Sequence, residues 1–473
     1  MNKKFFAALA SATMAFTASG SIAVFADDFV EEKTPVVDNG DVTPLPETVL
    51  WNKDNFGALV KLTGNNTVFT GLDGSVTLTE NKEVKTADLA EVTAINLTGL
   101  KGEIKGLEYF TKLGSFDDSA ATVTNTKLDF SANKVLTTLS VTKAADLSEI
   151  VLPEPTVTEK DGKKEEKYSL TTLTLKETAL TSLDLSAQKG LMTVTVTENS
   201  NLKDVKVENG TKRDVRKYTT LDLSKNNLAT IDLAYTQFDT LKLNENHIGA
   251  LDLSNTTVDT TLELNDQKFY VSETLKNVNL AETFENFEKE AVKAQKDVYD
   301  QETGVLTLAD AKETEYEYNT LVNGQKAPLK VKLEKANPMN RLYNPNSGEH
   351  FYTADIKEKA ALVDLGWNDE GYGWVAPRKE DSTVPVYRLY NPNAGDHHYT
   401  MNKGERDTLV AYGWKDEGTG WYSDTAKTVA VFRQYNPYAN GAGAHNYTTD
   451  KAENDHLVSL GWTPEGKAWY AIQ

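Results

Sequence analysis

The sequence predicts a mainly β protein with short helices, organised as a repeat solenoid, a strand-containing cap and a C-terminal β-rich module with pseudo-threefold symmetry. Two observations predict this fold class. A short leucine phrase recurs at a fixed period through the middle of the chain, and a longer motif occurs three times near its C-terminus. The chain has 473 residues, of which 39% are hydrophobic and 25% charged, as in globular proteins. We therefore expect several folded domains.

The N-terminus predicts secretion. Lys3 and Lys4 precede an apolar run that ends at Ala26 with the small-residue pattern of a signal-peptidase site, so residues 1–26 are predicted to be a signal peptide. A membrane anchor is the alternative, but the run is short and interrupted by Ser, Thr and Gly. The acidic, proline-containing residues 27–47 predict a solvated linker. We expect an extracellular mature chain without a transmembrane segment, held at the cell wall non-covalently if at all.

Composition excludes several classes of function. The chain has no cysteine, which excludes disulfides, thiolate nucleophiles and Cys-ligated zinc, and suits a secreted protein of a Gram-positive bacterium. Its formal net charge of -20 disfavours nucleic acid and anionic lipid as partners, because binding of phosphates needs a basic surface. We expect no nucleic-acid partner and no cofactor.

The leucine phrase predicts the middle of the chain. Units of the form LxLxxNxL follow one another every ten or eleven residues, and two units make a coil of about twenty residues, the span of a leucine-rich repeat. Looser copies upstream extend the predicted leucine-rich-repeat solenoid over residues 92–270. Alternate units should stack above one another, and the charged stretches 159–167 and 209–217 should be loops. The clearest units begin at Leu221, Ile231, Leu241, Leu251 and Leu262.

Within these units, the positions of polar residues predict their neighbours. Asp222, Lys242 and Glu263 should stack on one face of the sheet, giving a surface of mixed charge. Asn226 and Asn246 lie one coil apart and suggest a polar binding column. Asparagine at that place more often bonds backbone groups at the bend after a strand, so we favour a structural role.

Segments on both sides of the solenoid predict caps. Residues 48–91 form the predicted N-terminal cap, in which apolar residues at helical spacing from Trp51 to Leu62 predict a short helix. After Tyr270 the leucine period gives way to a charged, helix-compatible run over residues 280–300 and then to alternating, strand-like phrases. Residues 271–336 are therefore predicted to be a capping subdomain with strands.

A family resemblance supports the solenoid prediction. The phrases "NFGALVKL" and "AINLTGLKGEIKGLEYFTKLGSFD", together with the LDLS repeats, resemble the internalin-like extracellular leucine-rich repeat proteins of Gram-positive bacteria. The phrase "GLEYFTKL" at residues 106–113 is the most specific part of this likeness.

Residues 337–473 contain three copies of one motif. The copies begin with "RLYNPNSGEHFYT" at Arg341, "RLYNPNAGDHHYT" at Arg388 and "RQYNPYANGAGAHNYTT" at Arg433, and each continues to a Gly-Trp pair and a final tryptophan. Each copy predicts a strand, an Asn-Pro turn, a strand, a helix closed by glycine and a last strand. The pattern closely resembles the YNP…HxYT…GW repeat that closes many secreted bacterial proteins and whose function is uncharacterised. The third copy departs from it by the insertion "ANGAGA".

These repeats supply the candidate binding residues. Sugars are bound by aromatic faces that stack on their rings and by fixed hydrogen-bonding groups that contact their hydroxyls, and each repeat has both. We predict no catalytic residues and no metal site. The candidate glycan-binding residues are Tyr343, Asn344, His350, Tyr352 and Trp374; Tyr390, Asn391, His397, Tyr399 and Trp421; and Tyr435, Asn436, His445, Tyr447 and Trp469.

Two other interpretations of the repeats stay open. Threefold symmetry brings the three histidines to equivalent places, where they could form a zinc-type facial set in an extracellular hydrolase. Alternatively, the repeats are only a spacer or cap. In that case Trp367, Trp414 and Trp462 form a core, and the arginines that begin the motifs pair with Glu370, Glu417 and Glu465.

Taken together, the sequence predicts a secreted, non-enzymatic surface or matrix protein. We expect the solenoid face to bind a protein partner and the C-terminal module to bind a glycan or cell-wall polymer. Three weak sites in one module would act by avidity.

Overall fold

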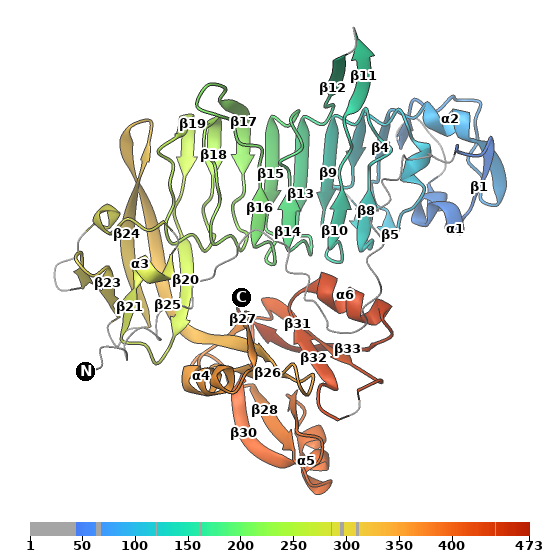
Figure 1. The fold of residues 1–473 in the computed structure, drawn as a ribbon. Helices are drawn as coiled ribbons and strands as arrows, with labels where there is room; N and C mark the ends of the chain where they lie inside the picture. The colour runs from blue at the N-terminus through green and yellow to red at the C-terminus, as the bar shows by residue number, and fades with distance from the viewer. Residues whose placement is uncertain are drawn as a thin grey trace.

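In the computed structural model, strands dominate and helices are short, which confirms the prediction of a mainly β protein (Figure 1). The predicted signal peptide and nearly all of the predicted linker lie outside the described residues. No helix in the described part of the chain is long and apolar enough to cross a membrane. The structure describes residues 44–62, 68–119, 121–160, 163–284, 286–293, 298–308, 312–439 and 441–473.

The N-terminal region differs from the single helix predicted there. Asn52 caps a one-turn helix by accepting a hydrogen bond from the Asn55 N–H, but the helix ends at Gly57, whose φ of 58° belongs to the left-handed region. A 3₁₀ turn follows instead of more α-helix. The elements are β1 (Thr48–Trp51), α1 (Lys53–Phe56), η1 (Ala58–Lys61), β3 (Lys82–Lys85), which pairs with β1, and α2 (Thr86–Ala90).

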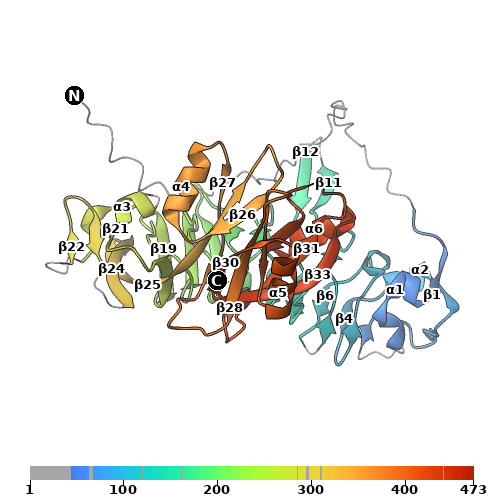
Figure 2. The ribbon, with the colours of Figure 1, turned by 90° about the horizontal axis from the view of Figure 1, so that it is seen from below.

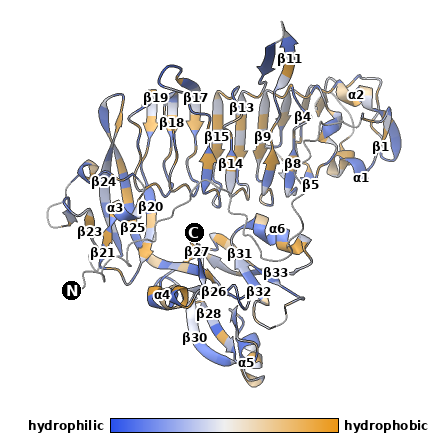
Figure 3. Ribbon diagram, viewed as in Figure 1, coloured by the Kyte–Doolittle hydropathy of each residue, from blue (hydrophilic) through white to orange (hydrophobic). Residues whose placement is uncertain are grey.

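A nine-stranded sheet runs through the middle of the chain. Its strands follow sequence order and pair in parallel, except for the antiparallel pair at its N-terminal edge. Along β9, β13 and β15, buried Leu or Val alternates with partly exposed residues, mostly Thr, the pattern of a sheet with one buried face (Figure 3). The strands are β2 (Phe69–Thr70), β4 (Ala94–Asn96), β6 (Ser115–Asp117), β9 (Thr138–Thr142), β13 (Thr172–Lys176), β15 (Thr193–Thr197), β17 (Arg216–Asp222), β18 (Thr236–Lys242) and β19 (Thr256–Glu263).

The strand register confirms that alternate leucine units stack. Leu221 of β17 pairs with Leu241 of β18, which pairs with Leu262 of β19. Ile231 and Leu251, which begin the units between them, are buried outside these strands. The same register places Asp222 beside Lys242 and Lys242 beside Glu263, as predicted, and Lys242 Nζ lies 2.9 Å from Glu263 Oε1.

The asparagines of the repeats have the structural role that we favoured. The Asn246 side-chain amide donates to the carbonyls of Leu223 at 2.9 Å and Leu243 at 3.0 Å, and its Oδ1 accepts from the Leu228 N–H at 3.1 Å. Asn226 makes equivalent bonds one coil earlier. Both are buried, so neither is free to bind a ligand.

Short ladders lie outside the nine-stranded sheet. One charged stretch predicted to be a loop is instead a hairpin, in which β11 (Thr156–Lys160) pairs with β12 (Lys163–Lys167). Its two strands project beyond the ends of the strands in the middle of the sheet (Figure 1). The other ladders join β5 (Lys101–Gly102) to β7 (Thr122–Val123), β8 (Lys127–Asp129) to β10 (Glu149–Val151) and β14 (Ser182–Asp184) to β16 (Asp204–Lys206), and the 3₁₀ turn η2 spans Leu107–Tyr109.

A long strand joins the repeat region to the C-terminal module. Strand β25 (Gln325–Tyr343) pairs first with β20 (Gln267–Ser272) and β24 (Glu313–Val322), then with the first repeat of the module. The predicted domain boundary after residue 336 falls inside this strand. In the predicted helical run 280–300, the described residues form α3 (Leu280–Thr283), η3 (Lys289–Ala291) and β22 (Tyr299–Asp300), beside β21 (Asn277–Asn279) and β23 (Val305–Thr307). The described residues of this run do not form the long helix predicted there.

The C-terminal module consists of three three-stranded antiparallel sheets, each with one helix, in the order predicted for each repeat. It lies against one side of the repeat region (Figure 2), where the Asn201 side chain donates to the Thr449 carbonyl at 3.5 Å. The first repeat contains the end of β25, β26 (His350–Thr353), α4 (Ile356–Asp364) and β27 (Asn368–Ala376). The others contain β28 (Pro385–Asn391), β29 (Asp396–Thr400), α5 (Lys403–Ala411) and β30 (Lys415–Tyr422), then β31 (Val429–Tyr435), β32 (His445–Thr448), α6 (Lys451–Ser459) and β33 (Thr463–Ala471).

Candidate functional site

Three tyrosines form a closed triangle at the centre of the module. Tyr352, Tyr399 and Tyr447 occupy equivalent places in the three repeats, and at most 1% of each is exposed. Their ring centroids lie 5.8, 5.7 and 5.6 Å apart in edge-to-face pairs. Each hydroxyl bonds the backbone of another repeat: Tyr352 donates to the Tyr447 carbonyl at 3.0 Å, Tyr447 donates to the Tyr399 carbonyl at 3.2 Å, and Tyr399 accepts from the Tyr352 N–H at 3.2 Å.

The final tryptophans of the repeats form a second triangle. The ring centroids of Trp374, Trp421 and Trp469 lie 5.7, 5.5 and 5.3 Å apart, and at most 3% of each residue is exposed. A buried ring has no face free for a sugar. The structure therefore corrects the prediction for the three tyrosines and three tryptophans, which form the core of the module and not a glycan site.

The tryptophans of the Gly-Trp pairs do not form that core. Trp367, Trp414 and Trp462 are only partly buried, each at the end of its repeat's helix. The expectation that they form the core was wrong. The tryptophans that turn inward are instead those on the last strand of each repeat.

The motif arginines join the repeats into a ring. Arg341, Arg388 and Arg433 pair with Glu370, Glu417 and Glu465 at 2.7, 2.8 and 2.7 Å, which confirms the predicted ion pairs. Each guanidinium also reaches a helix of another repeat. The second partners of the three arginines, in the same order, are Glu453 at 2.8 Å, Glu358 at 3.0 Å and Glu405 at 3.3 Å.

The three motif histidines lie at these separate ion pairs and do not converge. His350 Nε2 is 3.5 Å from Glu370 Oε2, His397 Nε2 is 3.6 Å from Glu417 Oε2, and His445 Nε2 is 3.4 Å from Glu465 Oε2. The facial set considered for a hydrolase is therefore not formed. Among the described residues, no group of three or more His, Asp or Glu is arranged to hold a metal ion.

The sequence did not predict a role for the acid that precedes the motif histidine in the first two repeats. Glu349 Oε1 lies 2.5 Å from His397 Nδ1 of the next repeat, and Asp396 accepts from the Gly443 N–H of the third repeat at 3.0 Å. The third repeat has Ala444 at this place. The sequence shows this position as Gly-Glu-His, Gly-Asp-His and Gly-Ala-His. Its role in joining the repeats becomes clear only from the hydrogen bonds between one repeat and the next.

The motif asparagines belong to their own turns. Oδ1 of Asn344, Asn391 and Asn436 accepts a hydrogen bond from the backbone N–H two residues later, at 2.9, 3.0 and 2.9 Å. This is the side-chain turn expected of an Asn-Pro corner. Their Oδ1 atoms therefore fix the corner, which places the preceding tyrosine at the surface.

The corner tyrosines are the candidate residues that keep exposed ring surface. Tyr343 and Tyr390 are partly buried, and 39% of Tyr435 is exposed. Each ring rests on the histidine of its own repeat, with centroids 5.0, 4.9 and 5.4 Å apart. We call the surfaces around Tyr343, Tyr390 and Tyr435 the three corners. Of the fifteen predicted binding residues, these tyrosines, supported by their histidines, form the remaining candidate site.

Burial keeps two histidines of the module uncharged. Burial, and the charge of Arg341, lower the pKa of His350 well below its usual value. Burial also lowers the pKa of His398, although its bond to Glu405 opposes this shift. The bond from His398 lowers the pKa of Glu405 to about 2. These neutral rings and ionised carboxylates belong to the seams between repeats.

The stability of the module is expected to fall as pH decreases below about 6.5, the ordinary histidine pKa. The unfolded chain binds protons at His350 and His398 more readily than the folded chain, so acid favours unfolding. Each histidine contributes a slope of up to about 1.4 kcal/mol per pH unit. Thermal midpoints measured between pH 7.5 and 5 check this, and His398→Asn, which copies Asn446 of the third repeat, should flatten the slope. An unchanged slope in that variant would contradict the assignment.

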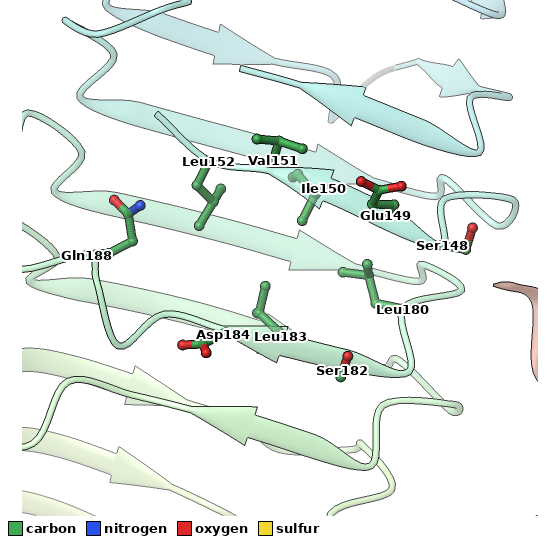
Figure 4. A pocket seen from close by; sticks show the side chains of 10 residues that line it. All are labelled: Ser148, Glu149, Ile150, Val151, Leu152, Leu180, Ser182, Leu183, Asp184 and Gln188. Carbon is green, nitrogen blue, oxygen red and sulfur yellow. The ribbon is translucent and has the colours of Figure 1, made fainter. Parts of the chain in front are cut away.

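The repeat region holds an open cavity of about 380 Å³ away from the module. It lies where the ladder behind the main sheet is interrupted between β10 and β14 (Figure 4). Its walls include Ile150, Leu152 and Leu183, and its two carboxylates, Glu149 and Asp184, lie on different strands. Glu149 is paired with Lys127 at 2.7 Å. The cavity therefore brings no set of reactive side chains together.

One family model matches the C-terminal module. Residues 338–472 match a family described as Domain of unknown function (DUF5648). No curated protein matches the chain. Among solved structures, it is similar to the functional domain of InlJ from Listeria monocytogenes, which includes a cysteine ladder: identity is 14%, the match covers 61% of this chain and 98% of that one, and the TM-score is 0.19. A TM-score this low does not establish a shared fold, and the internalin-like resemblance stays a prediction.

Proposed function

We propose that this chain is a secreted, non-catalytic surface or matrix protein whose C-terminal module holds a glycan or cell-wall polymer at its corners. One observation carries the proposal: the three equivalent corner tyrosines stay partly exposed, whereas the other candidate tyrosines and the candidate tryptophans are buried in the core. A tyrosine ring at a surface offers an apolar face for the C–H side of a sugar, and its hydroxyl and neighbouring polar groups can bond sugar hydroxyls.

The environment of the corners suits binding better than catalysis. Each corner carboxylate is already paired with an arginine, for example Glu465 with Arg433 at 2.7 Å. Bonds from His445 and the charge of Arg433 lower the pKa of Glu465, so the carboxylate stays ionised as a partner. Corners on separate sheets bind weakly one at a time, and a polymer that meets more than one of them gains by avidity.

We also propose that the repeat region is a leucine-rich-repeat solenoid that offers a face to a protein partner. The parallel register of Leu221, Leu241 and Leu262 supports the fold. The mixed charges of Asp222, Lys242 and Glu263 at one end of the sheet support a polar protein interface.

Replacing the three corner tyrosines together, as Tyr343→Ala, Tyr390→Ala and Tyr435→Ala, is expected to abolish retention of residues 27–473 on purified peptidoglycan. The loss should exceed about tenfold, because one stacking contact is removed at every corner. A co-sedimentation assay measures it.

A matched control keeps this test specific. Val135, Val157 and Leu321 are also apolar and exposed, with 45%, 53% and 46% exposure, but they lie outside the module. Alanine at these three positions should leave retention unchanged. Undiminished retention of the corner variant would show that the corners do not bind, and loss in the control alone would place the site outside the module.

A further inference from the structure

The third corner differs from the first two in a way that suggests its own occupant. Across the strand pairs, Tyr343 faces Asn368 and Tyr435 faces Thr463, so each corner adjoins the Gly-Trp turn that ends its helix. In the third repeat this turn is covered. A Cβ atom added at Gly461 would lie 3.0 Å from Tyr438 Oη and 3.3 Å from Tyr438 Cε2.

The corresponding glycines of the other repeats are uncovered. A Cβ atom added at Gly366 or Gly413 would meet nothing within 4 Å. The residue that covers this turn is not shared: the third repeat has Tyr438, followed by its insertion, where the first two have Asn346 and Asn393. Both asparagine side chains are exposed, and they are shorter than tyrosine and have no ring to place over the turn. The space over the turn is therefore open in two repeats and occupied in one.

Each glycine itself is required by the backbone. The φ angles of Gly366, Gly413 and Gly461 are 91°, 94° and 93°, in the region that favours glycine. The glycine turn is therefore common to all three repeats, and only its cover differs. Tyr438 is 74% exposed, so it covers the turn without forming part of the core.

We infer that Tyr438 occupies, within the chain, the place that a sugar ring takes at the first and second repeats, so that the module has two open corners and one closed by its own side chain. This rests on the proposed function and narrows it. Tyrosine and a pyranose are six-membered rings of similar size with a hydroxyl at the edge. The surface that the Tyr438 ring covers in the third repeat therefore has room for a pyranose ring in the other two.

The net charge of the chain disfavours anionic sugars as ligands. The acids after the two open glycine turns are paired: Arg341 holds Glu370 and Arg388 holds Glu417, while Lys359 lies 2.7 Å from Asp369 and Arg406 lies 3.8 Å from Asp416. The formal charge of -20 on the whole chain repels an anionic polymer. The ligand class is therefore an uncharged pyranose within a glycan chain.

Titration calorimetry with the tetramer of N-acetylglucosamine tests this on residues 27–473. The wild type should bind about two tetramers per chain, because two corners are open. Asn346→Tyr with Asn393→Tyr should close both corners and remove binding by at least about tenfold. Tyr438→Asn should open the third corner and raise the stoichiometry to about three. Wall teichoic acid, an anionic polymer, should not compete.

The control and the contrary results are distinct. Asn346→Ala with Asn393→Ala shortens both side chains without filling the space and should retain binding. The inference is overturned if Tyr438→Asn leaves the stoichiometry unchanged, if the double tyrosine variant binds like the wild type, or if the tetramer does not bind at all. Retention on peptidoglycan that still depends on the corner tyrosines would, in any of these cases, leave the proposed function standing.

Discussion

Tyr447→Ala is expected to destabilise the C-terminal module by about 3–5 kcal/mol, the usual cost of removing a buried aromatic side chain. The ring of Tyr447 contacts Tyr352, Tyr399 and Trp469, with centroids 5.7, 5.6 and 4.9 Å away. Its hydroxyl bonds both the carbonyl and the N–H of Tyr399 at 3.2 Å. Because these contacts cross between repeats, the loss opens the triangle on two sides.

Tryptophan fluorescence measures this loss selectively, since six of the seven tryptophans lie in the module. The thermal midpoint of the fluorescence transition should fall by about 10 °C or more. Tyr447→Phe keeps the ring but leaves two backbone groups of Tyr399 unpaired, and should cost about 1–3 kcal/mol. Tyr435→Ala, at the exposed corner of the same repeat, is the control and should cost less than about 1 kcal/mol. Equal losses at Tyr447 and Tyr435 would contradict the division into core and corner.

Arg341→Met should cost a similar amount, about 3–5 kcal/mol at pH 7.5, because it leaves two partly buried carboxylates without a counterion. The Arg341 side chain is 13% exposed, and its guanidinium holds Glu370 at 2.7 Å and Glu453 at 2.8 Å. These two carboxylates belong to the first and third repeats, so Arg341 closes the ring of ion pairs. Urea unfolding followed by fluorescence measures the free energy.

The pH dependence identifies the cause of that loss. Burial raises the pKa of Glu370, and the charge of Arg341 opposes this. Burial acts on Glu453 in the same direction, but Arg341 and hydrogen bonds hold its pKa below the ordinary value. Without Arg341 the pKa values of both carboxylates rise. The folded variant then binds protons at a higher pH than the unfolded chain does, so it regains stability as pH falls from 7.5 to 5. A deficit that stays constant over this range would show lost packing instead. Arg341→Met combined with Glu370→Gln should recover part of the stability at pH 7.5.

Much of the fold could be predicted because it depends on local periods. Leucines two residues apart in successive units predict both the buried face and the stacking of Leu221 on Leu241. The predictions that were wrong are those made from the charge or the helix propensity of a segment. Residues 163–167 of the charged segment form an exposed strand paired with β11 although they contain no apolar residue that would predict it, and Gly57 divides the first helix by its positive φ. The break within 280–300 depends on packing that no local pattern contains.

The candidate site was predicted less well because residue type does not give direction. Tyr343 and Tyr352 belong to the same motif, yet one lies at a corner and the other at the centre of the module. Side chains point alternately to the two faces of each strand in this hairpin. The sequence does not say which of the two sets of side chains faces the symmetry axis. The arginine pairs were predictable, since Arg341 and Glu370 recur together in every copy. Their second partners, such as Glu453, require knowledge of which repeat follows which around the ring.

The most direct test of glycan binding at the corners is a crystal structure of residues 27–473 with the tetramer of N-acetylglucosamine bound. We predict sugar density against Tyr343 and Tyr390, beside Gly366 and Gly413, with the central tyrosines unmoved. Sugar bound only elsewhere, on the nine-stranded sheet or in the cavity between β10 and β14, would contradict the account.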